Sequence, residues 1–263
     1  MGIVNVTPDS FSDGGRFAAR EQAVAHAVQL AAEGADWIDV GGESTRPGAA
    51  PVPAEVERER VVGVIADVVA RLPEVTVSVD TSKAGVAAAA LAAGAHVVND
   101  VTALGDPDMA AVCADHGAGV VLMHMRGTPA TMQRRTRYDD LVEEVCGFLA
   151  ERADYAIEAG IEAGHLHLDP GLGFGKAPLD NPALIAATPR LVALGFPVLI
   201  GASRKRFIGD LTGVTEAAQR VAGSVGAAIA AVACGASVVR VHDVAATCQA
   251  LAVYRAVMEA RTS

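Results

Sequence analysis

Basic charge and cysteine are both scarce in this chain of 263 residues. Lys and Arg number 21 against 31 Asp and Glu, which gives a formal net charge of −10. A general nucleic-acid binder is expected to carry a basic surface, so we expect no nucleic-acid partner. The cysteines stand singly, without a CxxC pair, which argues against a disulfide scaffold and a cysteine-bound metal. We expect four reduced, core-type thiols, at Cys113, Cys146, Cys234 and Cys248.

Long uninterrupted apolar stretches are absent as well. A membrane span needs about 20 consecutive apolar residues. The best candidate, residues 221–239, is uncharged but contains Gly223, Gly226 and Gly235 together with two serines. Its break near residue 235 predicts a buried helix that leads into a strand. No basic segment precedes an apolar run at the start of the sequence, so we expect a cytoplasmic protein without a membrane partner.

Short apolar runs rich in β-branched residues recur along the sequence. They have the length of strands and are mostly apolar throughout, as expected of parallel strands that are buried on both faces. Eight runs are present, at residues 2–6, 37–40, 75–79, 96–98, 119–123, 166–168, 198–200 and 237–241. Alanine-rich stretches with helical spacing lie between and after them, at residues 20–33, 54–72, 83–93, 107–116, 139–159, 181–195, 215–235 and 244–260.

This alternation of strands and helices predicts a parallel sheet. Eight units in 263 residues favour a closed (β/α)8 TIM barrel, an α/β fold of about 250 residues, over an open doubly wound sheet. No GxGxxG motif follows the first run, which further weakens a dinucleotide-binding fold. No linker is evident, so we expect a single barrel domain over residues 1–263.

Polar residues stand where the eight runs end. A single polar residue at a strand end is often a turn residue, but polar residues at all eight ends indicate a common site. Active sites of TIM barrels lie at the C-terminal ends of the strands. The residues are Asn5, Glu43, Asp80, Asn99, Asp100, His124, Asp169, Ser203, Arg204, Lys205, Arg240 and His242.

Two early segments carry groups for a cation and for a phosphate. Residues 1–15 place Asn5 in an apolar run and Asp9 and Asp13 in the following loop, and such oxygens suit a hard cation. Asp, Ser and Gly are also ordinary turn residues, so a plain capping loop is the alternative. Residues 39–49 carry hydroxyl groups and Arg46, which suit a phosphate but are also compatible with a solvated turn.

Later segments carry groups for a heterocycle and an anion. Asp80, Asn99 and Asp169 at one mouth would match a ring edge that donates from an amino group and a ring N–H, although Asp80 could simply cap the next helix. Arg240 and His242 stand two apart in a run, therefore on one face. We expect both to point inward as an anion site, the alternative being outward ion pairs with a helix.

Taken together, the motifs resemble the dihydropteroate synthase family, the folate-pathway enzymes that sulfonamides target. They run in the family's order from residue 1 to 243: MGIVNVTPDSFSDGG, ESTRPGA, SVDTS, NDV, DPGLGFGK, SRKRFIG and RVHD. The resemblance implies condensation of 6-hydroxymethyl-7,8-dihydropterin diphosphate with 4-aminobenzoate, giving 7,8-dihydropteroate and diphosphate with the help of Mg²⁺. It also implies a homodimer. The alanine-rich late helix over 215–235 would offer a close-packed surface for it, the alternative being that this helix packs on the barrel.

The resemblance also implies roles for individual residues. The pterin site would comprise Asp80, Asn99, Asp169 and Lys205, with Arg240 beside the ring and Met123 packed on it. Asn5 would bind Mg²⁺ and diphosphate, and further diphosphate contacts would come from Thr45, Arg46, Arg240 and His242. The aminobenzoate pocket would be shaped by Phe11, Pro47, Phe174, Lys205 and Arg206. Asp9 and Asp13 would lie in a mobile loop over the site, and the position of Arg206 is Ser in some family members.

Three alternative functions use the same residues. A pterin-binding methyltransferase would share the Asp and Asn groups but has no use for the basic residues around a diphosphate. A Schiff-base aldolase would use Lys205, whose pKa could be lowered by its basic neighbours. A pterin-binding protein without turnover would keep every motif, and only an activity measurement separates it from an enzyme.

Overall fold

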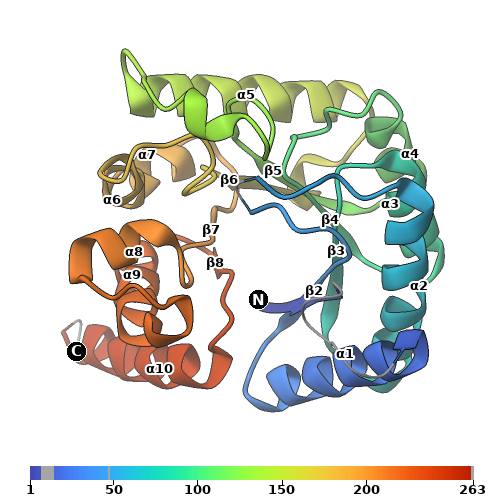
Figure 1. Cartoon of the computed structure of the whole chain (residues 1–263). Coiled ribbons are helices and arrows are strands. Elements are labelled where there is room, and N and C mark those ends of the chain that lie inside the picture. Colours follow the sequence, from blue (N-terminus) through green and yellow to red (C-terminus); the bar gives the residue numbers. More distant parts are fainter. Residues whose placement is uncertain (7–14, 47, 262–263) are drawn as a thin grey trace.

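The computed structural model describes residues 1–6, 15–46 and 48–261, and it places parallel strands inside a layer of helices (Figure 1). Six strands form one sheet in chain order, and β7 and β8 pair with each other. The strands are β1 (Gly2–Asn5), β2 (Trp37–Gly41), β3 (Thr76–Asp80), β4 (Val97–Asp100), β5 (Gly119–Met123), β6 (Leu166–Asp169), β7 (Leu199–Ile200) and β8 (Val238–Val239).

Single bridges join the two sheets at both edges. Leu168 of β6 bridges Val198, and Gly2 of β1 bridges Val241, both in parallel orientation. The amide of Val241 donates to the carbonyl of Met1 at 2.9 Å, which adds a hydrogen bond beside the second bridge. The strands therefore follow one another around a complete ring, and the predicted TIM barrel is confirmed.

Helices surround this ring (Figure 1). They are α1 (Gly15–Ala32), α2 (Ala54–Arg71), α3 (Ala84–Ala92), α4 (Met109–Asp115), α5 (Leu141–Glu158), α6 (Asp180–Ala186), α7 (Thr188–Val192), α8 (Arg206–Thr212), α9 (Val221–Ala233) and α10 (Val244–Ala260). Short 3-10 turns lie at Met132–Arg134, Ala163–His165 and Ala217–Gln219.

Helix α2 illustrates how the helices cover the strands. Val61, Val64, Ile65 and Val68 recur at spacings of three and four residues and are fully buried. This spacing forms one apolar stripe along a helix, so the stripe packs on the barrel. On the strands, Val77, Ser78 and Val79 are all fully buried, because both faces of a parallel sheet are covered.

Two predicted elements are split or markedly shortened in the structure, and one observed helix was not predicted. The helix predicted over 181–195 is split into α6 and α7, with Pro189 in the first turn of α7. Proline has no amide hydrogen and disfavours helical backbone before it, so it starts a new helix instead of extending one. Helix α8 was not predicted. The strand predicted over 237–241 is reduced to Val238–Val239, so strict alternation does not fix the directions of Arg240 and His242.

The stretch 221–239 folds as α9 followed by β8, as predicted. Within the described ranges, no helix is both long enough and apolar enough to cross a membrane. All four cysteines are free thiols. Cys113 and Cys146 are buried, whereas Cys234 and Cys248 are partly exposed.

Candidate active site

The strand register aligns predicted site residues at the carboxyl end of the barrel. Asn5 pairs with Gly41, Gly41 with Asp80, and Asp80 with Asn99 across β1 to β4. A Cβ added at Gly41 would lie 3.6 Å from Asp80 Oδ2 and 3.8 Å from Asn5 Oδ1, so these oxygens border one small space. Asp169 ends β6, level with Met123 of β5.

Arg240 lies between two buried carboxylates. Its Nε donates to Asp39 Oδ2 at 2.6 Å, and its Nη2 donates to Asp80 Oδ2 at 2.8 Å. The side chain of Asp39 is 0% exposed and that of Asp80 is 9% exposed. Charges at this depth are costly unless they are paired, which explains how an arginine is kept inside the barrel. Arg240 thus points inward as predicted, and the outward alternative is wrong for it.

Asp39 is a site residue that the sequence analysis did not single out. It accepts a hydrogen bond from Ser78 Oγ at 2.5 Å and another from Asn99 Nδ2 at 3.1 Å, in addition to that from Arg240. The amide oxygen of Asn99 makes no hydrogen bond to another described residue and is therefore open to a ligand. The missed signal was a carboxylate inside the apolar stretch WIDV, the same kind of signal that identified Asn5.

Neighbouring carboxylates at the strand ends serve different purposes. Burial raises the pKa of Asp80 to about 7, against the opposing influence of Arg240 and with a contribution from Asp39. Burial also raises the pKa of Asp100, but its oxygens accept from the amides of Thr102 and Leu104, both at 2.8 Å. Asp100 therefore holds the β4–α4 turn, and Asp80 is the carboxylate that borders the mouth.

Asp169, at the end of β6, and Lys205, after β7, also border the mouth. Burial lowers the pKa of Lys205 to about 8, although Asp169 favours its charged form. Burial raises the pKa of Asp169, and Lys205 counteracts this. Lys205 Nζ donates to the carbonyl of Leu172 and lies 4.4 Å from the ring centroid of Phe174. The predicted partners Asp169, Phe174 and Lys205 therefore form one cluster.

His124 lies behind the glycine loop that follows β6. Lys176, which was not predicted, is 4% exposed and places Nζ 2.7 Å from His124 Nδ1 and 3.0 Å from the His124 carbonyl. Burial lowers the pKa of His124 to about 3, so its ring is neutral, and burial also lowers the pKa of Lys176. Gly171 has φ +68°, and a Cβ there would lie 2.0 Å from the same carbonyl, so this turn requires glycine.

The polar side chains after β7 and β8 differ in whether they are free to contact a ligand. His242 Nδ1 lies 3.0 Å from Ser203 Oγ, which also accepts from the His242 amide at 3.1 Å. Burial lowers the pKa of His242 to about 4, with further lowering by Arg204, Arg240 and Arg46, so the ring is neutral near pH 7. Arg204 pairs with Asp243 at 2.5 Å and is therefore already occupied.

The remaining predicted residues lie at the periphery or outside the described residues. Thr45 is half-buried and Arg46 is exposed on the β2–α2 segment. Arg206 begins α8 with a side chain that is 89% exposed and lies 3.7 Å from Asp210. Asp9, Phe11, Asp13 and Pro47 lie outside the described residues, and their roles stay predictions.

Asn5 fits the role of a magnesium ligand. The described residues contain no group of three or more His, Cys, Asp or Glu that could hold a metal. Mg²⁺ commonly takes one or two protein ligands and completes its shell with water and substrate phosphates. The amide of half-buried Asn5 makes no hydrogen bond to another described residue, so its oxygen is open for such a contact at the mouth.

Known proteins resemble this chain over nearly its whole length. Residues 1–242 match the family described as pterin binding enzyme. Dihydropteroate synthase from Neisseria meningitidis serogroup B is 50% identical over 262 residues, covering 97% of this chain and 91% of that protein. That of Escherichia coli K12 is 44% identical over 261 residues, covering 99% of this chain and 92% of the relative.

Solved structures agree with these relatives. Xanthomonas albilineans dihydropteroate synthase with 4-aminobenzoic acid superposes with a TM-score of 0.93 at 55% identity, covering 98% of this chain and 92% of that chain. The same enzyme in complex with 7,8-dihydropteroate gives 0.89 at 52% identity and the same coverage. The resemblance drawn from the motifs is thereby confirmed, and the chain belongs to the dihydropteroate synthase family, a family of pterin-binding transferases.

Proposed function

We propose that the chain condenses 6-hydroxymethyl-7,8-dihydropterin diphosphate with 4-aminobenzoate to give 7,8-dihydropteroate and diphosphate. One observation carries this proposal: acceptor groups and cations lie together at one barrel mouth. Arg240 connects them there, because it donates hydrogen bonds to both Asp39 and Asp80. The structures of a similar synthase with 4-aminobenzoic acid and with 7,8-dihydropteroate support both the second substrate and the product.

The pterin edge would meet acceptors at the ends of β3, β4 and β6. Its amino group and ring N–H would donate to Asp80 and Asp169, and the amide oxygen of Asn99 is open to the same ring. Met123 is buried, lies level with Asp169 in the strand register, and offers an apolar, polarisable surface. These carboxylates are buried, and a buried acceptor without a hydrogen bond is costly. A hydrogen bond from a ligand N–H to each carboxylate would therefore favour binding.

The reaction would proceed by cleavage of the bond between the pterin methylene carbon and the diphosphate oxygen. The arylamine nitrogen would then form the C–N bond and release one proton to the diphosphate or to solvent. Positive charge that develops on the pterin methylene delocalises into the electron-rich ring, and Asp169 stabilises it from nearby. Arg46, Arg240 and His242 would bind the departing diphosphate where its charge grows. Mg²⁺, held through Asn5, would supply additional positive charge to the diphosphate.

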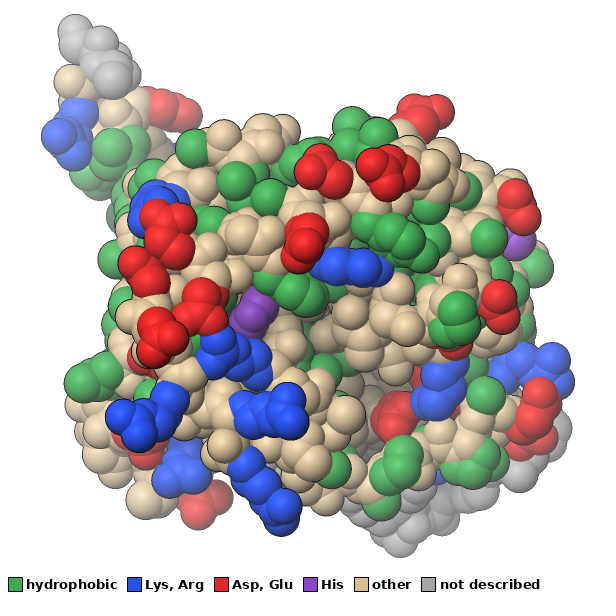
Figure 2. Space-filling view, turned by 90° about the horizontal axis from the view of Figure 1, so that it is seen from above, with side chains coloured by type: hydrophobic (Ala, Val, Ile, Leu, Met, Phe, Trp, Pro, Cys, Tyr) green, Lys and Arg blue, Asp and Glu red, His purple; other side chains and the backbone are tan. Residues whose placement is uncertain are grey.

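The acidic net charge is compatible with this anionic substrate. Figure 2 views the molecule from the α5 side and shows Asp and Glu side chains spread over this outer surface, with Lys and Arg side chains among them. Net charge sums over the whole surface, whereas binding depends on the field inside the cleft. Inside the mouth, the cations Lys205 and Arg240 are held at depth.

A direct test of the diphosphate site is calorimetric titration of the chain with diphosphate, with and without Mg²⁺. Binding that requires Mg²⁺ and is lost in Asn5→Ala supports the synthase. A methyltransferase-type barrel has no such site, so absence of Mg²⁺-dependent binding would count against the proposed reaction.

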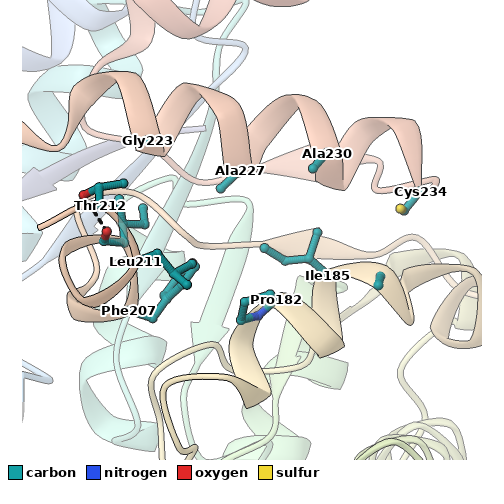
Figure 3. A pocket seen from close by; sticks show the side chains of 11 residues that line it. Pro182, Ile185, Phe207, Leu211, Thr212, Gly223, Ala227, Ala230 and Cys234 are labelled. Carbon is teal, nitrogen blue, oxygen red and sulfur yellow. Dashed lines mark hydrogen bonds between the residues drawn. The ribbon is translucent and has the colours of Figure 1, made fainter.

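We propose further that the chain forms a homodimer through an apolar hollow between α6, α8 and α9. Figure 3 shows Phe207 and Leu211 of α8 and Pro182 and Ile185 of α6 facing the small residues of α9. Leu211 is 58% exposed, although it is a large apolar side chain. Small residues such as Ala227 on α9 allow close approach of a second copy, and the late helix predicted for this role contains them.

A further inference from the structure

Lys83 joins two carboxylates beside the candidate site. It is the residue before α3, three positions after Asp80, and its Nζ forms ion pairs with Glu43 and Glu57. Glu43 belongs to the segment after β2, and Glu57 belongs to α2. The mechanism uses none of these three residues, and only Glu43 was expected at the site, as one of the polar residues at the strand ends; together they connect the ends of β2 and β3.

The carboxylate of Glu43 ties together the two described parts of the β2–α2 segment, residues 42–46 and 48–52. One oxygen pairs with Lys83, and the other accepts from the amide of Val52 at 3.1 Å. Arg60 of α2 adds a contact at the start of the segment, because its Nη1 donates to the carbonyl of Gly42 at 2.7 Å. Thr45 and Arg46 lie between these anchored ends.

Glu57 holds Lys83 in place through a buried ion pair. Its side chain is 0% exposed, and its Oε1 has no hydrogen-bond partner among the described residues. A buried carboxylate strongly requires its counter-ion, so Lys83 is held in place by this pair. Burial by itself would lower the pKa of Lys83, but the hydrogen bonds to Glu43 and Glu57 outweigh it and raise the pKa, so the ammonium group stays charged.

Backbone packing makes the position of the segment sensitive to this network. A Cβ added at Gly42 would lie 2.8 Å from Val61 Cγ1 and 3.0 Å from Glu57 Cγ, so the chain runs directly against α2. The position of Glu57 therefore affects both the ion pair and the backbone that leads to Thr45. Arg46 is near enough to His242 to lower the pKa of that histidine, so a shift of the segment reaches the predicted diphosphate site.

We propose that Lys83 is a positioning residue. It holds the β2–α2 segment, and with it Thr45 and Arg46, at a fixed position relative to Asp80 at the barrel mouth. The inference rests on the proposed reaction, since it assigns this segment to the diphosphate. Its consequence is selective: the diphosphate side of the substrate depends on Lys83, and the pterin edge does not.

The test compares Lys83→Met, Lys83→Arg and the matched control Arg20→Met. Arg20 pairs with Asp67 of α2 at 2.7 Å, so its replacement removes an ion pair to the same helix away from the segment. For Lys83→Met we expect the KM for the pterin diphosphate to rise about tenfold or more, since small misplacements of binding groups are costly. We expect the Kd of a pterin without diphosphate to change by less than about twofold, because Asp80 and Asn99 keep their partners.

Hydrogen exchange supplies a readout that does not depend on activity. Amides of the β2–α2 segment should exchange faster in Lys83→Met than in the parent chain, because local opening becomes easier. Lys83→Arg should restore most of the protection and of the KM, and Arg20→Met should leave both at the parental values. Glu43→Gln keeps the Lys83–Glu57 pair and provides the same comparison if Lys83→Met folds poorly.

Two results would overturn the inference while leaving the proposed reaction intact. One is an active parent chain whose Lys83→Met and Glu43→Gln variants keep the parental KM and exchange rates. The other is an equal loss of affinity for the pterin with and without its diphosphate, which would place the effect at β3. A parent chain without any turnover would instead count against the proposed reaction itself, and the exchange data would still decide whether Lys83 holds the segment.

Discussion

Arg240 Nη2 lies 2.8 Å from Asp80 Oδ2, across 160 positions of sequence. The same guanidinium donates to Asp39, so one side chain links the residues after β8 to β2 and β3. The ion-paired group that closes the barrel mouth is thus also the group expected beside the pterin and diphosphate. Stability and function are coupled at this point.

Replacing Arg240 with Met should lower the free energy of unfolding by about 3 kcal/mol near pH 8, because it leaves two buried carboxylates without their cation. The pKa of Asp80 is already about 7, and it should rise further in the variant. A folded-state pKa above the unfolded one gives stability that is lost as pH rises through it. The deficit should therefore be smaller at pH 5 than at pH 8, as measured by urea unfolding. Equal deficits at both pH values would contradict this account of the pair.

Replacing Asp39 with Asn should weaken pterin binding about tenfold or more, because the amide keeps only one acceptor oxygen and loses the charge that makes these hydrogen bonds strong. Asn99 Nδ2 and Arg240 Nε both donate to Asp39. Calorimetry with a pterin lacking diphosphate measures the effect. Ser78→Ala removes only one donor to Asp39 and should cost less. An unchanged affinity in Asp39→Asn would show that Asp39 does not orient the site.

The pH profile of kcat/KM should be bell-shaped with its optimum between pH 7 and 8. Asp80, with a pKa of about 7, accepts hydrogen bonds fully only above that pH, so activity rises through it. Lys205, with a pKa of about 8, loses its charge above that pH, so activity falls. Lys205→Arg keeps its charge at alkaline pH and should lose the falling limb. A falling limb unchanged in that variant would assign it to another group.

Replacing Leu211 with Glu should convert a dimer to a monomer at micromolar concentration, because the hollow of Figure 3 would then have to bury a charge. Val253→Glu is the matched control, since Val253 is 67% exposed on α10 and does not line the hollow. Light scattering after gel filtration gives the mass. A dimeric Leu211→Glu variant would place the interface elsewhere.

The fold was predictable because local patterns carry it. Buried parallel strands leave continuous apolar runs, and glycines such as Gly34 and Gly94, both at φ +103°, mark the ends of helices. Helix α8 escaped prediction because it has only seven residues and its first residue, Arg206, belongs to the basic cluster of residues 204–206. The helix is short and is ended by Gly213, at φ +76°.

Site residues were predictable only where a polar residue stands at the end of an apolar strand. Asp80, Asn99 and Asp169 do so, and the strand register then places them at one mouth. The partners of charged residues could not be predicted, because they lie far away in sequence. Arg204 was expected among the polar residues of the common site, but Asp243 occupies it. Lys176 was not assigned a role, although it is buried against His124.

The measurement that tests the central claim most directly is the stoichiometry of turnover. The purified chain is mixed with 6-hydroxymethyl-7,8-dihydropterin diphosphate, 4-aminobenzoate and Mg²⁺, and diphosphate and 7,8-dihydropteroate are quantified over time. We predict sustained release of one diphosphate for each 7,8-dihydropteroate formed, with loss of both in Arg240→Met. No diphosphate above background, despite tight pterin binding, would identify a pterin-binding protein without turnover and contradict the proposed reaction.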